Sequence, residues 1–171
     1  MWVSIGLVLI VLFTMWITWT AARIDRLNAR CDAGWVSLDA QLVRRAAALG
    51  AVVDERAADA VVPNAKGVRS TIETALTVNR DARAAVENVI SATIAELYGG
   101  AESELPAGLV DACLRVRVAR TFYNDAVRAN RTLREQQLPR LLKLGSKTHR
   151  PAYFDIEDTA GTPLVRDLTT P

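Results

Sequence analysis

Few side chains in this sequence are of the types that perform acid–base or metal chemistry. Asp32 and Asp39 stand seven residues apart, a spacing that places both carboxylates on one helix face, where they could serve acid–base catalysis or hold a metal. The single histidine, His149, lies in the basic stretch KTHRP, where nothing in the sequence would orient it as a catalytic base. One histidine and no Glu-x-x-His element argue against a di-metal site in a helical bundle. We therefore expect no enzyme activity, no cofactor and no metal.

Three aromatic residues and an arginine pair are further candidates for a binding site. Trp35, Phe122 and Tyr123 could line a pocket, but aromatic side chains at helical spacing beside leucines are typical of a packed core. Arg44 and Arg45 could bind an anionic ligand through their forked guanidinium groups. We expect the aromatic residues to lie in the core, and the two arginines to be solvated or paired between helices.

The composition indicates a folded chain without a nucleic-acid partner. Of the 171 residues, 50% are hydrophobic and 23% are charged, which excludes a disordered or fibrous chain. The formal net charge of +2 provides no electrostatic case for binding nucleic acid. The two cysteines, Cys31 and Cys113, are too few for a disulfide framework or a four-ligand zinc site.

The amino-terminal stretch has the length and composition of a transmembrane helix. Residues 2–22 carry no charge, and about 20 helical residues span a hydrocarbon core of roughly 30 Å. Trp2 lies at one end, and Trp16 and Trp19 lie towards the other, as indoles do at membrane interfaces. A cleaved signal peptide would instead need a basic start, a shorter apolar run and a small-residue cleavage site. We therefore expect residues 1–22 to be a retained anchor in membrane lipid.

Basic residues follow this stretch and set its expected orientation. Nothing basic precedes it, whereas Arg23, Arg26 and Arg30 come directly after it. The positive-inside rule therefore predicts that the amino terminus lies outside and the carboxyl-terminal domain in the cytoplasm. At headgroup height each arginine could also contribute about 1 kcal/mol against anionic lipid, so a lipid-organising role is one possible reading.

Apolar residues recur three and four residues apart in three later stretches, which is typical of amphipathic helices. Pro63 ends the first, Gly99 ends the second and Pro106 begins the third. The stretches cover residues 24–53, 68–97 and 109–133. The sequence predicts an all-α chain whose transmembrane helix continues into an antiparallel bundle of long helices, of coiled-coil type, over residues 23–158, with a flexible tail at residues 159–171.

An up-down-up order of the three helices would bring particular residues to the same height. Cys31 and Cys113 each lie about seven residues into a helix, so we expect two neighbouring, reduced core thiols. By the same counting Asp39 lies level with Arg120 and Asn124, which predicts an ion pair or hydrogen bond between the first and third helices.

Three stretches, in order along the chain, resemble the LemA family. They are NARCDAGWVSLDAQLVRR at 28–45, RVRVARTFYNDAV at 115–127 and PAYFDIED at 151–158. The chain departs from the family at residues 46–53, AAALGAVV. The resemblance implies a bacterial membrane-anchored helical bundle that faces the cytoplasm and has no established catalytic activity. The matching positions, which it implies to be structural, are Asn28, Trp35, Asp39, Gln41, Leu42, Arg44, Arg45, Ala119, Phe122, Tyr123, Asn124, Ala126, Val127, Tyr153 and Phe154.

The favoured function is a structural or protein-interaction scaffold on the cytoplasmic face of a bacterial plasma membrane. Its partners would be membrane lipid, through residues 2–22, and a protein partner or a second copy of the chain. The leucine-rich segment at residues 138–145, LPRLLKLG, could close the end of the bundle or dock a partner. The alternative is a ligand-binding module or enzyme with a pocket between helices. That pocket would be lined by Asp39, Arg45, Arg120 and Tyr123.

Overall fold

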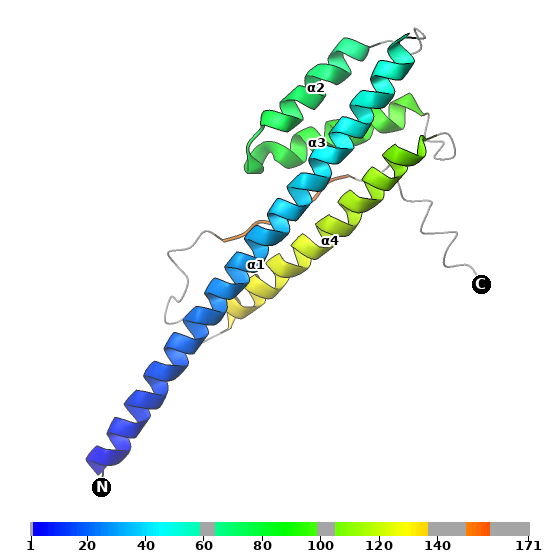
Figure 1. Ribbon diagram of the computed structural model, residues 1–171. Helices are drawn as coiled ribbons and strands as arrows, with labels where there is room; N and C mark the ends of the chain where they lie inside the picture. The colour runs from blue at the N-terminus through cyan, green and yellow to red at the C-terminus, as the bar shows by residue number, and fades with distance from the viewer. Residues whose placement is uncertain (1, 59–63, 99–104, 137–149, 158–171) are drawn as a thin grey trace, which may run out of the picture. The chain divides into compact units, whose positions relative to one another are not determined.

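The computed structural model describes residues 2–58, 64–98, 105–136 and 150–157, and within these ranges it is helical with no strand (Figure 1). This confirms the predicted all-α bundle with a long apolar amino-terminal helix. The chain divides into two compact units, the first made of residues 1–35 and 122–153, the second of residues 36–121 and 154–171. The helices are α1 (Trp2–Ala58), α2 (Ala65–Thr77), α3 (Arg80–Leu97) and α4 (Ala107–Glu135).

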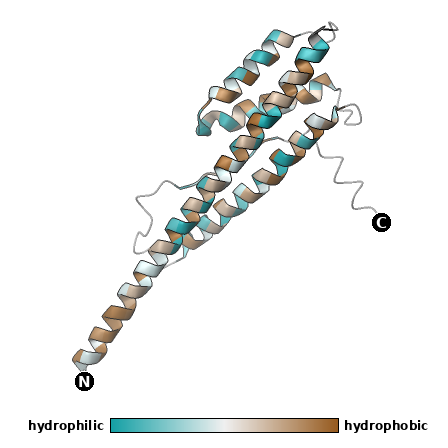
Figure 2. Ribbon diagram, viewed as in Figure 1, coloured by the Kyte–Doolittle hydropathy of each residue, from teal (hydrophilic) through white to brown (hydrophobic). Residues whose placement is uncertain are grey.

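Helix α1 runs for 57 residues without interruption. Its amino-terminal part is uncharged and coloured mostly hydrophobic in Figure 2. The apolar side chains of this part are exposed. By length and composition this is one helix of the described chain that could cross a membrane. The apolar stripe expected from residue 24 onward begins inside the same helix, so the continuation of the apolar segment into the amphipathic one is confirmed.

The prediction of one helix over residues 68–97 is wrong, because the chain forms two helices there, α2 and α3. Val78 takes an extended conformation with ψ of 145°, and the side chain of Asn79 accepts a hydrogen bond from the Ala82 amide, which caps α3. Leu76 on α2 and Val89 on α3, which the apolar spacing of residues 68–97 would bury, are both exposed. Capping of a new helix therefore outweighs continuation of the old one.

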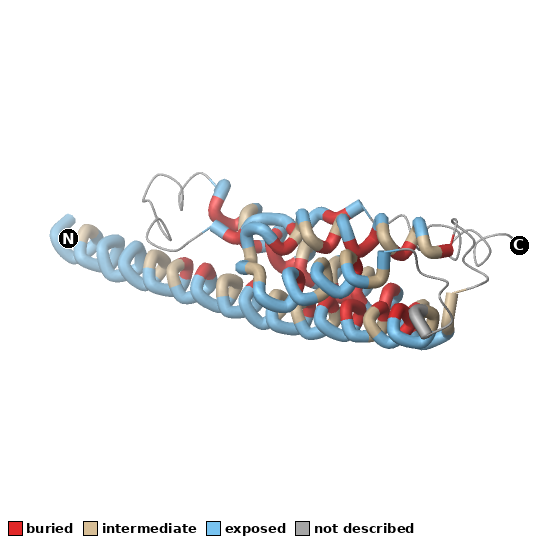
Figure 3. The backbone as a smooth tube through the Cα atoms, turned by 90° about the horizontal axis from the view of Figure 1, so that it is seen from above, coloured by how far each residue is buried: buried red, intermediate tan, exposed pale blue. Residues whose placement is uncertain are grey.

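The second unit has its own apolar core. Residues from the later part of α1 pack against α2, α3 and the start of α4, and Figure 3 shows buried positions gathered where these helices meet. Ile72 reaches to within 3.7 Å of where a side chain on Gly50 would begin, so α1 and α2 approach closely there. The fully covered members of this core are Ala46, Leu49, Val53, Ala75, Ile90, Ile94 and Leu109.

The first unit packs α1 against the later part of α4. The ring of Trp35 meets the ring of Tyr123 edge-on, with 5.7 Å between centroids. Tyr123 is buried, as predicted for a core aromatic, whereas Trp35 is half-buried. The stripe expected on α4 is buried throughout, from Leu109 to Leu133. Phe122 is a correction, because it is 69% exposed and not in the core. It precedes Tyr123 by one position, which turns its side chain about 100° away around the helix.

Cys31 and Cys113 are both buried and form no disulfide, which agrees with the expected free thiols. One belongs to each unit, so their proximity stays a prediction. Several other expectations fall on residues outside the described part of the chain. These are the leucine-rich segment at 138–145, His149 and the tail at 159–171.

Candidate functional site

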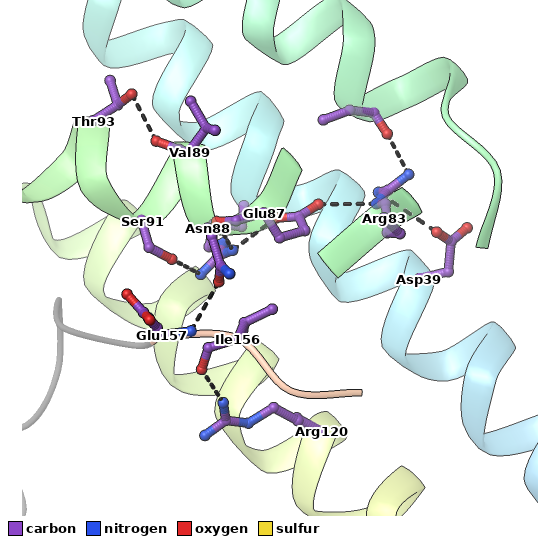
Figure 4. Close-up of polar contacts among 12 residues, drawn as sticks. Asp39, Arg83, Glu87, Asn88, Val89, Ser91, Thr93, Arg120, Ile156 and Glu157 are labelled. Atoms are coloured by element: carbon purple, nitrogen blue, oxygen red, sulfur yellow. Dashed lines mark hydrogen bonds and ion pairs between the residues drawn. The ribbon is translucent and has the colours of Figure 1, made fainter. Parts of the chain in front are cut away.

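A buried network of charged side chains lies in the second unit, between α1 and α3 (Figure 4). Arg45 donates from Nη2 to Oε2 of Glu87 at 2.7 Å, and both side chains are 0% exposed. Arg83, one turn before Glu87 on α3, donates from Nε to the other carboxylate oxygen, Oε1, at 2.9 Å. Glu87 therefore uses both carboxylate oxygens to hold two guanidinium groups.

Further polar groups surround this core of three charges. Arg83 donates from Nη1 to the carbonyl oxygen of Ala75 on α2 and lies 3.5 Å from the carboxylate of Asp39 on α1. Arg45 donates from Nη1 to the hydroxyl oxygen of Ser91 at 3.3 Å. The network thus connects α1, α2 and α3 through side chains that are buried, except for the half-buried Asp39.

The positive and negative charges in the network balance only when the half-buried carboxylate of Asp39 is counted. Two buried guanidinium groups face one buried carboxylate, and the carboxylate of Asp39 supplies the second negative charge from a half-buried position. Burying charge is expensive unless each charge has an opposite partner and hydrogen bonds, which these residues provide for one another. The arrangement can fix helix positions, and its three central side chains, Arg45, Arg83 and Glu87, are covered from solvent.

Asp39 and Arg120 are not paired with each other, which corrects the expected contact. Asp39 faces Arg83 on α3, and Arg120 donates from Nη1 to the carbonyl oxygen of Ile156 at 2.7 Å. The backbone amide of Glu157 donates to the side chain of Asn88 at 2.8 Å. The carboxyl-terminal stretch of the second unit therefore occupies the arginine that was expected to meet Asp39.

A second polar cluster lies in the first unit, between α1 and α4. The side-chain oxygen of Asn28 accepts hydrogen bonds from Nδ2 of Asn130 and Nη2 of Arg134, both at 2.8 Å. Burial lowers the pKa of Arg134, and the nearby charge of Arg150 lowers it further, while Cys31 and Asp25 raise it. Asn28 is thus the common acceptor for two donors that are themselves buried.

The segment 150–153 is held against α4 in the first unit. Tyr123 donates its hydroxyl to the carbonyl oxygen of Ala152 at 2.6 Å. Arg131 donates from Nε and Nη2 to the carbonyl oxygen of Pro151, and its guanidinium lies 4.7 Å from the centre of the Tyr153 ring. Tyr123 and Arg131 therefore hold the non-helical residues 150–153 against α4.

The motif positions from the family resemblance fall into three groups. Leu42, Arg45, Tyr123 and Phe154 are buried, as are Ala119, Ala126 and Val127. Asn28, Trp35, Asp39, Gln41 and Asn124 are half-buried. Arg44, Phe122 and Tyr153 are exposed, and so are the basic residues of the flank, Arg23, Arg26 and Arg30.

Sequence reasoning missed the two residues of α3 that complete the network. Arg83 and Glu87 stand four residues apart, which places them together on one helix face, but this spacing is also common on solvated helices. An acidic residue opposite Arg45 was the missing half of the expected inter-helix pair. The cap at Asn79 carried a usable signal, because it marks the start of a separate helix on which Arg83 and Glu87 lie one turn apart.

Two grooves of the second unit lie between α2 and α3, and the four polar residues of the alternative pocket line neither of them. A groove of about 460 Å³ lies between α2 and α3, and Val68, Val89 and Leu97 are among its apolar walls. Neither Asp39, Arg45 nor Arg120 lines it, and a smaller neighbouring groove of about 270 Å³ is likewise formed by α2 and α3. Within the described ranges no three His, Cys, Asp or Glu residues cluster as metal ligands would.

Comparisons with known proteins give no further guidance. No family model, no curated protein and no solved structure matches this chain.

Proposed function

We propose that this protein is a membrane-anchored structural scaffold, similar to the LemA family, with a helical domain on the cytoplasmic face of a bacterial plasma membrane. The observation that carries the proposal is the continuity of α1 from the uncharged apolar segment into the helices of the second unit. A single helix of this kind couples an anchor to a folded domain without a linker. Three exposed arginines at the end of the apolar segment support the cytoplasmic placement.

The use of the charged side chains supports a structural role over catalysis. Glu87 is occupied on both oxygens, and Arg83 and Arg45 point at partners within the fold. Catalytic groups need access to a substrate, and residues this deeply covered lack it. The network therefore acts to hold α1, α2 and α3 together.

The anchor is tested by placing one charge in the middle of the apolar segment. Leu9→Arg should release the chain from membranes on alkaline extraction, because an arginine at the bilayer centre costs about 2.5–3.5 kcal/mol on insertion scales. Leu76→Arg, also at an exposed leucine but on α2, is the matched control and should stay in the membrane fraction. Release of the unaltered chain by alkali would overturn the anchor.

Orientation is tested with a thiol placed on the second unit. Cys31 and Cys113 are buried, so the unaltered chain gives a low background of labelling. Ser70→Cys, at an exposed position of α2, should react with a membrane-impermeant maleimide only after the cells are lysed. Labelling of intact cells would place the domain outside and contradict the proposal.

The scaffold role itself is tested by extracting the protein in a patch of its own lipid and identifying what accompanies it by mass spectrometry. A stoichiometric protein, or further copies of this chain, is the expected result. A retained small molecule would favour the ligand-binding alternative, which would then be assigned to the groove between α2 and α3. Val89→Trp, which fills that groove from one wall, should then abolish retention.

A further inference from the structure

Helix α1 carries a second apolar face on the side away from its core. Six apolar side chains recur along it at alternating steps of four and three residues, all of them exposed, with Val36 at 68% and Val43 at 37%. This is the spacing of the a and d positions of a coiled coil. The six residues, here called the heptad face, are Ala29, Ala33, Val36, Ala40, Val43 and Ala47.

The heptad face lies almost opposite the residues that α1 buries. At about 100° per residue, Val36 and Val43 stand on the far side of the helix from Leu38, Leu42 and Leu49. A helix needs one apolar stripe to join its own core, so a second continuous stripe calls for another helix. Its alanines leave room for that helix to approach closely.

The residues beside the heptad face are charged in a regular way. Aspartates flank it on one edge, at the positions called g in a coiled coil, and arginines flank it on the other, at e, with Ser37 at the e position between them. Asp25, Arg30 and Arg44 are exposed, and Asp39 is half-buried with one carboxylate oxygen 3.5 Å from Arg83. Among the described residues neither Arg30 nor Arg44 forms an ion pair.

We propose that a second copy of this chain packs on the heptad face, with the two α1 helices parallel. In a parallel pair a g residue meets the e residue five positions later on the other helix. Asp25 would then face Arg30 of the partner subunit, and Asp39 would face Arg44 of the partner subunit. An antiparallel pair would set arginine against arginine and aspartate against aspartate, so the charge pattern selects the parallel arrangement.

The anchor favours the same arrangement. Two chains inserted in one membrane in the same sense bring their α1 helices together in parallel, and confinement to the membrane raises their effective concentration. The heptad face spans about 27 Å by the helical rise and is made of small side chains. The inference thus names the partner of the proposed scaffold, but the charge pattern carries it independently of the anchor.

Cysteine cross-linking of the full chain in lipid vesicles tests the arrangement. Ala29→Cys and Ala47→Cys, at opposite ends of the heptad face, should each form a disulfide-linked dimer with itself on mild oxidation. Val118→Cys, at an exposed valine of α4, and the unaltered chain are the controls and should stay monomeric. Cross-linking only when the Ala29 and Ala47 variants are mixed would show an antiparallel pair and overturn the proposal, as would cross-linking no faster than that of Val118→Cys.

Charge exchange separates specific pairing from loss of folding. Asp25→Arg and Arg30→Asp alone should each weaken the dimer roughly tenfold, because each replaces attraction by repulsion twice in a symmetric pair. The two substitutions together should restore it. The two single substitutions change the charge next to the membrane in opposite directions. An effect of lipid would therefore change dimerisation in opposite directions in the two single variants. Equal dimerisation of all four chains, measured by energy transfer between labelled copies, would contradict the pairing.

The outcomes separate this inference from the proposed function. A chain that resists alkaline extraction yet stays monomeric at every protein-to-lipid ratio would overturn the dimer and leave the anchored scaffold standing. A chain that dimerises in detergent but leaves the membrane in alkali would overturn the anchor alone.

Discussion

Oε2 of Glu87 lies 2.7 Å from Nη2 of Arg45, and neither side chain is exposed to solvent. The two residues are separated by 42 positions along the chain and come from α1 and α3. A covered ion pair of this kind holds its two helices in place, because separating either partner from the other leaves a charge without solvent or counter-charge.

Removing the charge of Glu87 should therefore destabilise the second unit strongly. Glu87→Gln leaves the guanidinium groups of Arg45 and Arg83 facing a neutral amide, and we expect the free energy of unfolding to fall by about 3–5 kcal/mol. Urea unfolding followed by circular dichroism in detergent micelles measures the change. Asp111→Asn, which breaks the exposed pair with Arg115, is the control and should leave the free energy of unfolding nearly unchanged.

A double substitution distinguishes the pair from two independent effects. Arg45→Met combined with Glu87→Gln should lose less stability than the two single changes taken separately, by about 0.5–3 kcal/mol. The same unfolding measurement serves. Losses that simply add would show that the two residues do not stabilise each other.

The break between α2 and α3 depends on the cap at Asn79. Asn79→Ala removes the acceptor that holds the Ala82 amide, and we expect the free energy of unfolding to fall by about 1 kcal/mol. Asn79→Asp keeps a capping oxygen at the same position and should leave stability almost unchanged. Equal losses from both substitutions would mean that the cap is not what starts α3.

Alkaline stability should depend on Tyr98. Burial raises the pKa of Tyr98 above its ordinary value of 10.0, with Arg56 lowering it and Glu55 raising it. Because the folded chain holds the phenolic proton to higher pH than the unfolded chain, this contribution to stability is complete below pH 10.0 and declines as the pH rises towards the folded-state pKa. Tyr98→Phe should reduce that decline, seen as the unfolding midpoint against pH, whereas Tyr153→Phe, at an exposed ring, should not.

Asn28 should tolerate one substitution and not another. Asn28→Ala removes the acceptor of both Asn130 and Arg134, and stranding these buried donors should lower the free energy of unfolding by about 1–3 kcal/mol. Asn28→Asp keeps an oxygen in place and adds a charge facing Arg134, so it should preserve or raise the unfolding midpoint. A loss from Asn28→Asp equal to that from Asn28→Ala would contradict the role of the acceptor.

Periodicity predicted the helices that meet a core along one continuous stripe. The stripe on α4 is buried from Leu109 to Leu133, because no cap or proline interrupts it there. The prediction for Phe122 was wrong because hydrophobicity alone does not say which side of a helix a residue faces. Its neighbour Tyr123 already occupies the buried side. Whether a residue next to such a stripe is buried or exposed depends on its angular position around the helix.

The charged network could not be predicted from composition, because whether a charged side chain is buried depends on contacts with residues distant in the sequence. Arg45 was correctly given inter-helix pairing as one option, but its partner could not be found while α2 and α3 were treated as one helix. The extended backbone at Val78 ends α2, and Glu87 lies on the buried face of α3 together with Arg83, Ile90 and Ile94.

The covered pair also settles which turn of α3 lies beside which turn of α1. Apolar side chains such as Leu42, Leu49 and Ile90 are similar enough that two helices could slide past each other by one turn, about 5.4 Å, and still bury hydrocarbon. Such a slide would carry Glu87, together with its α3 partner Arg83, away from Arg45 and leave the buried guanidinium of Arg45 without a counter-charge inside the core. The network thus excludes slipped packings that the leucines and isoleucines would accept.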